Sequence, residues 1–456
     1  MRDPGSFRDP SGFIIYENDK VYRIVNKLYQ KHYDHLMNSG LYECLAKDNW
    51  LVSHLENNDK SRTQDQYRIL DVQKIFPITY PYEWSFSQLK DAALLTLDIQ
   101  KKCIEYGMTL KDATPYNIQF RDNAPIFIDT LSFEMVENNF AWKPYRQFCE
   151  MFIGPLSLMS YKDPRLNKLL ISFINGIPLP LINKLLSFRD KLRPSVFMHL
   201  VLHHWLSSTS NESSKKEGTT KTIGKKQHLN IITQLQSFVT KLAVLNEKSE
   251  WGDYNSETIS EKKNYVEDKE VTINSFLQGL HFDLTWDIGS NDGYYSRVIA
   301  NTYSKEVLSL DIDWKCVEKN YKINTKKSIT NVFPILLDLS NPPPSIGWMN
   351  KERSNIYERI GSPDLICCFA IMHHIINDNI PISYFIDLLC RSTGHVLLEY
   401  VPISDPKCQK IFKSRGDDFE YPSKEYFEEL LHKNFAILKS KTLDETERIL
   451  YLLKKK

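Results

Sequence analysis

The chain has 456 residues, a length typical of two or three domains, and 42% of them are apolar while 25% are charged. This composition is typical of a globular protein and excludes collagen-like or wholly disordered chains. The 58 Lys and Arg residues nearly balance the 57 Asp and Glu residues, so a net charge of +1 gives no general attraction to nucleic acid. We therefore expect no nucleic-acid partner.

The sequence patterns of secretion and of membrane spans are missing. Residues 1–20 contain charges and prolines but no apolar core of a signal peptide. The longest apolar stretch, Leu365–Ile376, contains two histidines and is shorter than the roughly 20 residues that cross a bilayer. The eight cysteines form no C-x-x-C pair, which predicts reduced thiols. We expect a cytoplasmic protein with no membrane span and no bound metal.

One polar segment is predicted to divide the chain. Residues 207–227 read SSTSNESSKKEGTTKTIGKKQ, and so few apolar side chains cannot offset the entropy lost when a segment becomes ordered. We interpret residues 207–227 as a linker between an N-terminal domain, residues 1–206, and a C-terminal domain, residues 228–456. Both domains are long enough to form a core of their own.

The N-terminal domain is predicted to have an α+β fold. It opens with a hairpin formed by Phe13–Tyr16 and Val21–Val25, and a long helix follows over Ser87–Tyr106. Two short strands, Asn117–Phe120 and Ile126–Ile128, come after that helix.

A polar pattern follows the long helix of the N-terminal domain. Asp112 and Asn117 form D-x-x-x-x-N, and Asp129 follows the next strand. The pattern resembles the catalytic lobe of aminoglycoside-type kinases, which implies that Asp112 positions an acceptor hydroxyl while Asn117 and Asp129 hold magnesium. The Gly-rich loop and the Val-x-Ile-Lys strand are missing. We expect a degenerate kinase-like domain that binds a substrate, nucleotide or partner; phosphotransfer and a simple turn remain the alternatives.

The C-terminal domain alternates apolar strands with helical segments, which predicts an α/β fold. The expected strands are Leu284–Ile288, Val307–Ile312, Val332–Leu337, Leu365–Ile371 and His395–Tyr400, and a helix is expected over Tyr294–Asn301. Such an order favours a Rossmann-like parallel sheet with helices on both faces. In open sheets of this kind, ligands bind at the carboxyl ends of the strands.

The first of these strands runs into the sequence D-x-G-x-N-x-G and then into a helix. Gly289 and Gly293 permit a tight turn and a close approach of ligand to backbone, and Asn291 tolerates left-handed geometry. The spacing differs from the dinucleotide pattern G-x-G-x-x-G. A turn without a ligand is the alternative.

Acidic residues recur at the ends of the first three strands, at Asp287, Asp311 and Asp338. Carboxylates would repel a pyrophosphate, whereas S-adenosylmethionine carries a sulfonium and an ammonium and no phosphate. As alternatives, Asp311 is a helix cap and Asp338 is an ordinary loop residue.

With these motifs in this order, the C-terminal domain resembles the class I S-adenosylmethionine-dependent methyltransferases. The resemblance implies a methyltransferase whose cofactor, S-adenosylmethionine, is bound by Asp287, Gly289, Asn291, Gly293, Asp311 and Asp338. It also implies that the strand at Leu365–Ile371 ends on the acceptor side. There His373 is a candidate base, with a role in shaping the pocket as the alternative.

The acceptor is indicated only by a missing motif. Enzymes that methylate nucleic-acid bases usually carry Asn/Asp-Pro-Pro-Tyr/Phe after this strand, and this chain has Ile371-Met372-His373-His374 instead. We therefore expect a small-molecule or saccharide acceptor. By position, Trp251, Tyr254 and Tyr265 precede the first strand, where related enzymes build a lid. Arg415, Asp417, Asp418 and Tyr421 follow the fifth strand, in a loop that is a candidate for the rest of the acceptor pocket. Exposed loop residues are the alternative for both segments.

The two halves together resemble a bacterial methyltransferase family related to a host-specific nodulation protein. The stretches that carry this resemblance are Tyr80–Leu95, Leu110–Glu134 and Tyr145–Cys149. The resemblance implies an S-adenosylmethionine-dependent methyltransferase and indicates no acceptor. A binding or scaffold protein with a relic cofactor pocket is the alternative from a different class.

Overall fold

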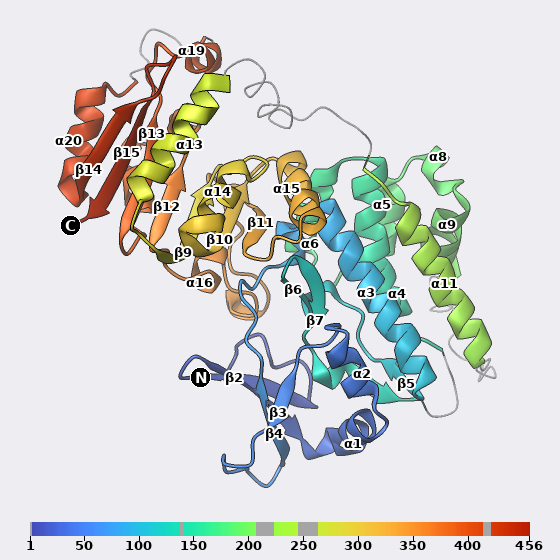
Figure 1. The fold of residues 1–456 in the computed structure, drawn as a ribbon. Coiled ribbons are helices and arrows are strands. Elements are labelled where there is room, and N and C mark those ends of the chain that lie inside the picture. Colours follow the sequence, from blue (N-terminus) through green and yellow to red (C-terminus); the bar gives the residue numbers. More distant parts are fainter. Residues whose placement is uncertain (1, 137–140, 207–222, 245–262, 414–420) are drawn as a thin grey trace. The chain divides into compact units, whose positions relative to one another are not determined.

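The computed structural model describes residues 2–136, 141–206, 223–244, 263–413 and 421–456, and it divides into two compact units (Figure 1). The N-terminal unit comprises residues 1–247 and 344–359, and the C-terminal unit comprises residues 248–343 and 360–456. Within the described residues, every helix is too short or too polar to cross a membrane.

The division differs from the expected linker at residues 207–227. Residues 207–222 lie outside the described residues, but helix α11, Lys225–Lys241, belongs to the N-terminal unit and packs on helix α3, Phe86–Glu105. The physical reason is an apolar face on α11 that needs a partner. Its buried residues are His228, Ile232, Leu235, Phe238 and Val239. The expected linker includes only residues 225–227 of α11, and residues 228–241, expected in the C-terminal domain, belong to the N-terminal unit instead.

The N-terminal unit contains a four-stranded antiparallel sheet in the order β1-β2-β4-β3. The strands are β1 Gly12–Glu17, β2 Lys20–Asn26, β3 His54–Glu56 and β4 Gln66–Val72. The expected hairpin is confirmed, because β1 pairs with β2 around Asn18 and Asp19. Both turn residues have positive φ, as a two-residue hairpin turn with the right twist requires.

Helices and two short strand pairs form the rest of the N-terminal unit. The helices are α1 Gln30–Asn38, α2 Leu41–Lys47, α3, α4 Tyr145–Phe148, α5 Gly154–Tyr161, α6 Leu169–Ser172, α7 Leu179–Leu185, α8 Phe188–Lys191, α9 Pro194–Val196 and α11. The strand pairs are β5 Met108–Leu110 with β8 Phe133–Met135, and β6 Ile118–Arg121 with β7 Ala124–Phe127. The expected long helix is confirmed as α3, which begins after Ser85 because Ser85 and Gln88 form a capping box.

Residues 344–359 are fixed in the N-terminal unit although they lie in the chain between two strands of the C-terminal unit. Arg359, at the end of α16 (Ile356–Arg359), pairs with the fully buried carboxylate of Glu83. The guanidinium also lies over the Tyr80 ring, 4.1 Å from its centroid. A buried carboxylate that lost this partner would be an uncompensated charge, so the pair ties the segment to its unit.

We expect Arg359→Ala to lower the free energy of unfolding of the N-terminal unit by about 3–5 kcal/mol, because it leaves Glu83 charged and buried. The measurement is urea denaturation followed by the fluorescence of the buried Trp84 and Trp142. Lys74→Ala is the matched control, because in the ion pair of Lys74 with Asp19 the two side chains are 56% and 99% exposed, and such a pair should contribute less than about 1 kcal/mol. Equal losses in both variants would contradict the assignment.

The C-terminal unit is built on a seven-stranded sheet in the order β11-β10-β9-β12-β13-β15-β14. The strands are β9 Phe282–Ile288, β10 Ser304–Asp311, β11 Val332–Leu336, β12 Leu365–Cys368, β13 His395–Tyr400, β14 Phe435–Thr442 and β15 Ile449–Lys455. The five expected strands are present and parallel, whereas β15 runs antiparallel to both β13 and β14. Strand β12 ends earlier than expected because Ala370 has positive φ and a helix begins at Met372.

Helices cover this sheet. They are α13 Lys263–Leu277, α14 Tyr294–Thr302, α15 Trp314–Lys326, α17 Met372–Asn377, α18 Ile382–Leu389, α19 Pro406–Phe412 and α20 Lys424–Asn434. Buried side chains of α13 and α14 join those of β9, β12, β13 and β15 in one apolar core, and both helices lie along the same face of the sheet (Figure 1). From β9 the sheet extends to β10 on one side and to β12 on the other, which makes the carboxyl ends of β9 and β12 a topological switch point.

Candidate functional site

The glycine-containing turn follows β9 at this switch point. Gly289 and Gly293 have φ of 69° and 74°, and Asn291 between them has φ of 51°. A Cβ on Gly293 would lie 2.4 Å from the side chain of Asn320, and one on Gly289 would lie 2.7 Å from Ile371. Both conformation and packing therefore require glycine at these two positions.

Asp311, the last residue of β10, holds the turn against the sheet. Its Oδ2 accepts a hydrogen bond of 2.7 Å from the Asn291 amide, and its Oδ1 accepts one of 2.8 Å from the Asp313 amide. Burial raises the pKa of Asp311 to about 7, although the two amides favour the ionised form. The structure thus joins the second predicted acid directly to the glycine-containing turn.

Asp287, in β9, is fully buried beneath the same turn. Its Oδ2 accepts a hydrogen bond of 2.5 Å from Ser296, whereas its Oδ1 has no hydrogen-bond partner. The nearby Ser290 hydroxyl is also buried without a partner. Burial raises the pKa of Asp287 to about 6. These two atoms at the switch point are available to hydrogen-bond a ligand.

The other acids at this edge have structural partners. Asp292 pairs with Lys319 at 2.8 Å, and Asp313 caps α15 by accepting from the Lys315 amide. Asp338 lies two residues after β11, and its Oδ1 accepts from the Ser340 amide at 3.0 Å. The backbone joins Asp338 to the site, because the neighbouring Leu337 amide donates to the Asp311 carbonyl at 2.8 Å.

His373 lies in the first turn of α17 and not at the end of a strand. It is buried, and its Nδ1 has no hydrogen-bond partner. Burial, followed by the charge of His374, lowers the pKa of His373 to about 3. The imidazole is therefore neutral at physiological pH and is a weaker proton acceptor than an ordinary histidine.

A buried ionic network that sequence reasoning missed lies at the end of β13. The carboxylate of Glu399 accepts from Lys269 at 2.6 Å and from Arg448 at 3.3 Å, and Arg448 also pairs with Asp405 at 2.8 Å. Burial alone would raise the pKa of Glu399, but the charges of Lys269 and Arg448 lower it to about 2. Only the glutamate inside the apolar stretch VLLEY signalled such a partner; nothing in the sequence around Lys269 or Arg448 did.

Aromatic rings surround the ammonium of Lys269. Its Nζ lies 4.3 Å from the ring centroid of Phe369 and 4.4 Å from that of Tyr295, and Tyr265 is 5.7 Å away. Tyr265 also donates a hydrogen bond of 2.5 Å to Glu399. These contacts make Tyr265 part of the core rather than of a lid.

The remaining acceptor-pocket candidates are only partly described. Trp251, Tyr254, Arg415, Asp417 and Asp418 lie outside the described residues. Tyr421 donates a hydrogen bond of 2.6 Å to the Val401 carbonyl beyond β13. Its hydroxyl therefore has a backbone partner.

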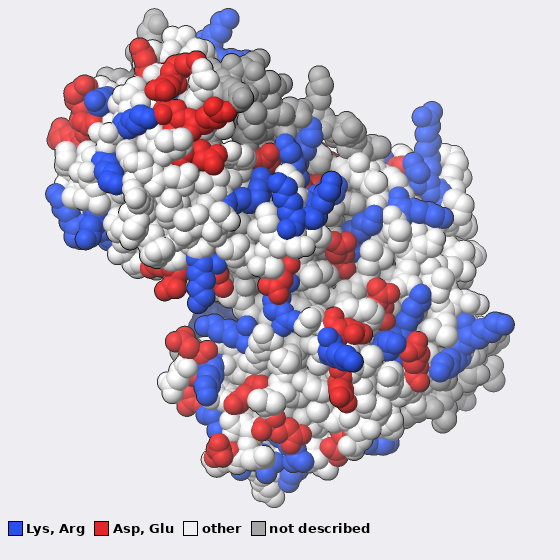
Figure 2. Space-filling view, viewed as in Figure 1, with Lys and Arg blue, Asp and Glu red and all other residues white. Residues whose placement is uncertain are grey.

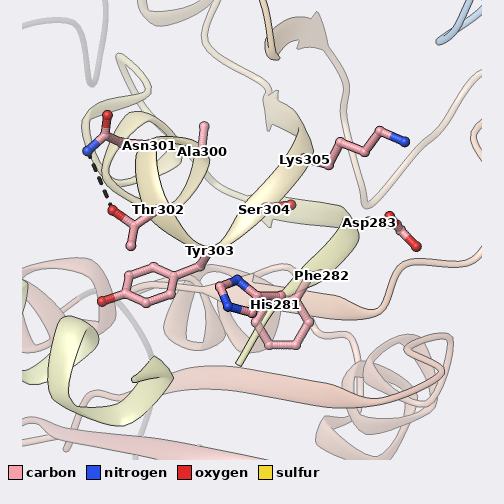
Figure 3. A pocket seen from close by; sticks show the side chains of 9 residues that line it. All are labelled: His281, Phe282, Asp283, Ala300, Asn301, Thr302, Tyr303, Ser304 and Lys305. Atoms are coloured by element: carbon pink, nitrogen blue, oxygen red, sulfur yellow. Dashed lines mark hydrogen bonds between the residues drawn. The ribbon is translucent and has the colours of Figure 1, made fainter. Parts of the chain in front are cut away.

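A separate cavity of about 470 Å³ lies at the amino ends of β9 and β10 (Figure 3). It is lined by His281, Phe282, Asp283 and residues 300–305. This edge is opposite the carboxyl ends where the motif residues lie, so the cavity is not the predicted cofactor site.

In the N-terminal unit, Asp129 is already engaged by a cation. Arg23 of β2 pairs with Asp129 at 2.6 Å, and Asp129 also accepts from the Leu131 amide at 3.1 Å. Burial, together with the charge of Asp129, raises the pKa of Asp112. The side-chain nitrogen of Asn117, Nδ2, is 3.5 Å from the Ser132 hydroxyl oxygen. The Lys111 amide donates a hydrogen bond of 2.8 Å to the Ser132 carbonyl, which brings the segment that leads into Asp112 next to the segment that follows Asp129.

We expect Lys269→Met to lower the free energy of unfolding of the C-terminal unit by about 3–5 kcal/mol at pH 7, because Glu399 loses a buried partner. The pKa of Glu399 is lowered in the folded state. Ionised Glu399 therefore adds to the free energy of unfolding above about pH 4.3, and this stabilisation is lost as the pH falls toward 2. The free energy of unfolding that Lys269→Met removes should therefore be smaller at pH 3 than at pH 7.

Chemical denaturation at pH 7 and pH 3 measures this difference. Lys441→Met is the control, because Lys441 is 42% exposed in its pair with Asp268 and should contribute less than about 1 kcal/mol. A loss from Lys269→Met that does not depend on pH would contradict the role assigned to Glu399.

Comparison with known proteins finds one relative that matches over nearly the full length, and solved structures that match less than half of the chain. The chain is 28% identical to nodulation protein NoeA of Rhizobium meliloti (strain 1021), with 99% of this chain and 95% of that protein covered. No protein-family model matches the chain.

Two of the solved structures that match the chain are methyltransferases with low sequence identity to it. N-methyltransferase NodS from Bradyrhizobium japonicum WM9, in complex with S-adenosyl-L-homocysteine, is 10% identical with a TM-score of 0.33, covering 45% of this chain and 98% of that chain. Magnesium protoporphyrin IX methyltransferase from Synechocystis PCC 6803, with bound S-adenosylmethionine, is 13% identical with a TM-score of 0.31, covering 46% and 100%.

Proposed function

We propose that the C-terminal unit is an S-adenosylmethionine-dependent methyltransferase. The observation that carries the proposal is the unpartnered Oδ1 of Asp287, buried beneath a left-handed glycine-containing turn at the switch point of the sheet. The five parallel strands lie in the order β11-β10-β9-β12-β13, which is 3-2-1-4-5 when they are numbered along the chain. In open α/β sheets, ligands bind where such an order reverses. The sequence resemblance to class I methyltransferases supports the same ligand.

The residues at the site fit S-adenosylmethionine. Asp287 and Asp311 are buried carboxyls whose pKa values lie well above the ordinary value, so a ligand cation would stabilise their ionised forms. The methionine part of the cofactor carries an ammonium and a sulfonium and can supply that charge. The unpartnered hydroxyl of Ser290 adds a polar group that a ligand can satisfy.

Each residue has a defined task in this proposal. Gly289 and Gly293 supply the positive φ that shapes the turn around the cofactor, and the Asn291 amide attaches that turn to Asp311. Asp287 receives the methionine end, Asp311 accepts from the ribose hydroxyls, and Asp338 lies toward the adenine. The cofactor supplies an activated methyl group. The chain itself chiefly has to hold the acceptor in line with that methyl and exclude water.

His373 is proposed as the acceptor-side residue. It is neutral and has an unpartnered Nδ1, so it can accept a hydrogen bond from the acceptor. Because its pKa is about 3, its titration should produce no inflection in a pH–rate profile between pH 5 and 9. A small molecule or saccharide is the proposed acceptor.

The N-terminal unit is proposed to recognise the acceptor. The coupled carboxyls Asp112 and Asp129, with Arg23 beside them, form a partly buried polar cluster that can hydrogen-bond hydroxyl groups. In this proposal the kinase-like unit binds the acceptor and does not transfer a phosphoryl group. Magnesium-dependent ATP turnover that Asp129→Ala abolishes would contradict it.

Calorimetric titration with S-adenosylmethionine tests the methyltransferase proposal. We expect micromolar binding that Asp311→Ala weakens tenfold or more, about 1.4 kcal/mol, because the substitution removes both a ligand contact and the brace of the turn. Ser423→Ala is the control. It removes the N-cap of α20, which costs about 1 kcal/mol of stability, and should leave the dissociation constant unchanged. Folded protein that gives no binding heat would identify the pocket as a relic.

A further inference from the structure

An exposed apolar face lies at the end of the helical part of the N-terminal unit. We call it the α8 face. Its exposed apolar members are Leu185, Phe188, Leu192, Phe197 and Met198, which come from the end of α7, from α8 and the residue after it, and from the π-helical segment that follows α9. The Phe188 side chain is 75% exposed and Leu192 is 63% exposed. Large apolar residues scattered singly are normal on a surface, whereas five within fourteen residues, 185–198, indicate a docking surface.

The exposed charges of the α8 face have one sign. Lys184, Arg189 and Arg193 are exposed on the same stretch, and Lys191 is half-buried. Basic side chains project from the surface at the place of α8, on the right of the view in Figure 2.

The single acid of the α8 face is turned inward. Asp190 is buried and pairs with Lys162 at 2.5 Å. It also caps α8 together with Ser187, which donates to it at 2.5 Å. Its carboxylate also lies 3.9 Å from Arg193, so it partly offsets that cation, but among the described residues it forms no ion pair with Lys184 or Arg189.

The spacing of these residues puts apolar and basic side chains side by side. Phe188 begins α8 and Leu192 is its C-cap with helical backbone, so these two side chains, four residues apart, lie on the same side of the turn. Arg189 directly follows Phe188 and is exposed next to this apolar pair, whereas Arg193 lies beyond the helix in extended backbone. A basic surface with large apolar side chains is what an interfacial membrane-binding segment presents, with the apolar groups at the acyl boundary and the cations at the phosphates.

We propose that the α8 face docks the protein onto an anionic phospholipid bilayer as a peripheral contact. Apolar side chains alone would fit a protein partner equally well. The cations, with the single acid withdrawn into the core, favour a uniformly negative surface. Such docking would bring the enzyme to an acceptor held at the membrane, a consequence that rests on the proposed function, whereas the docking itself does not.

Vesicle co-sedimentation of the full chain tests the docking. We expect binding to vesicles of phosphatidylcholine with 30 mol% phosphatidylglycerol, and little binding to phosphatidylcholine alone. Phe188→Ser with Leu192→Ser should abolish binding, and Lys184→Gln with Arg189→Gln should weaken it by about fivefold per cation. Binding should also weaken in 0.5 M salt, because screening shortens the reach of exposed charges.

The control is Leu28→Ser with Leu55→Ser, two residues that are 72% and 77% exposed elsewhere in the N-terminal unit. It should bind vesicles as the wild type does, and circular dichroism of every variant checks that it is folded.

Equal binding to neutral and anionic vesicles, or wild-type binding by the Phe188→Ser/Leu192→Ser variant, would overturn the proposal. Self-association in sedimentation velocity that the same pair removes, without vesicle binding, would assign the face to a second copy. Cofactor titration of the same variants should be unchanged, which separates a failure of docking from a failure of the methyltransferase proposal.

Discussion

The carboxylate of Asp311 is the contact on which the candidate site depends. It connects the end of β10 to the turn after β9 through the Asn291 amide, and to the start of α15 through the Asp313 amide. These bonds fix the left-handed turn that leaves Asp287 and Ser290 buried without full hydrogen bonding. A site held in this way is organised before any ligand arrives, so binding spends little free energy on ordering.

Two buried ion pairs supply the specificity of the surrounding fold. Lys269 and Glu399 join α13 to β13 inside the C-terminal unit, and Arg359 and Glu83 fix residues 344–359 within the N-terminal unit. Buried pairs add little net stability but strongly penalise arrangements that separate the partners.

The sequence was most informative where the local pattern determines the structure. The parallel strands and the turn at Gly289 and Gly293 follow from apolar runs and from residues that tolerate positive φ, and both are present. Long-range pairing has no such local signal, which is why Lys269 and Arg448 were missed. The start of α11 was assigned to a linker because its apolar face is recognisable only against α3. The burial of His373, and with it a pKa of about 3, likewise depends on distant packing.

The central claim is that the buried carboxyls Asp287 and Asp311 receive a cationic cofactor. The most direct test is titration with S-adenosylmethionine at pH 6.5 in buffers of different ionisation heat, which counts the protons released. With pKa values of about 6 and 7, both groups are partly protonated at this pH, and bound positive charge and hydroxyl donors should lower both pKa values. The account predicts proton release, and affinity that rises with pH up to about 8. Binding without proton release, or affinity that falls as the pH rises, would contradict it.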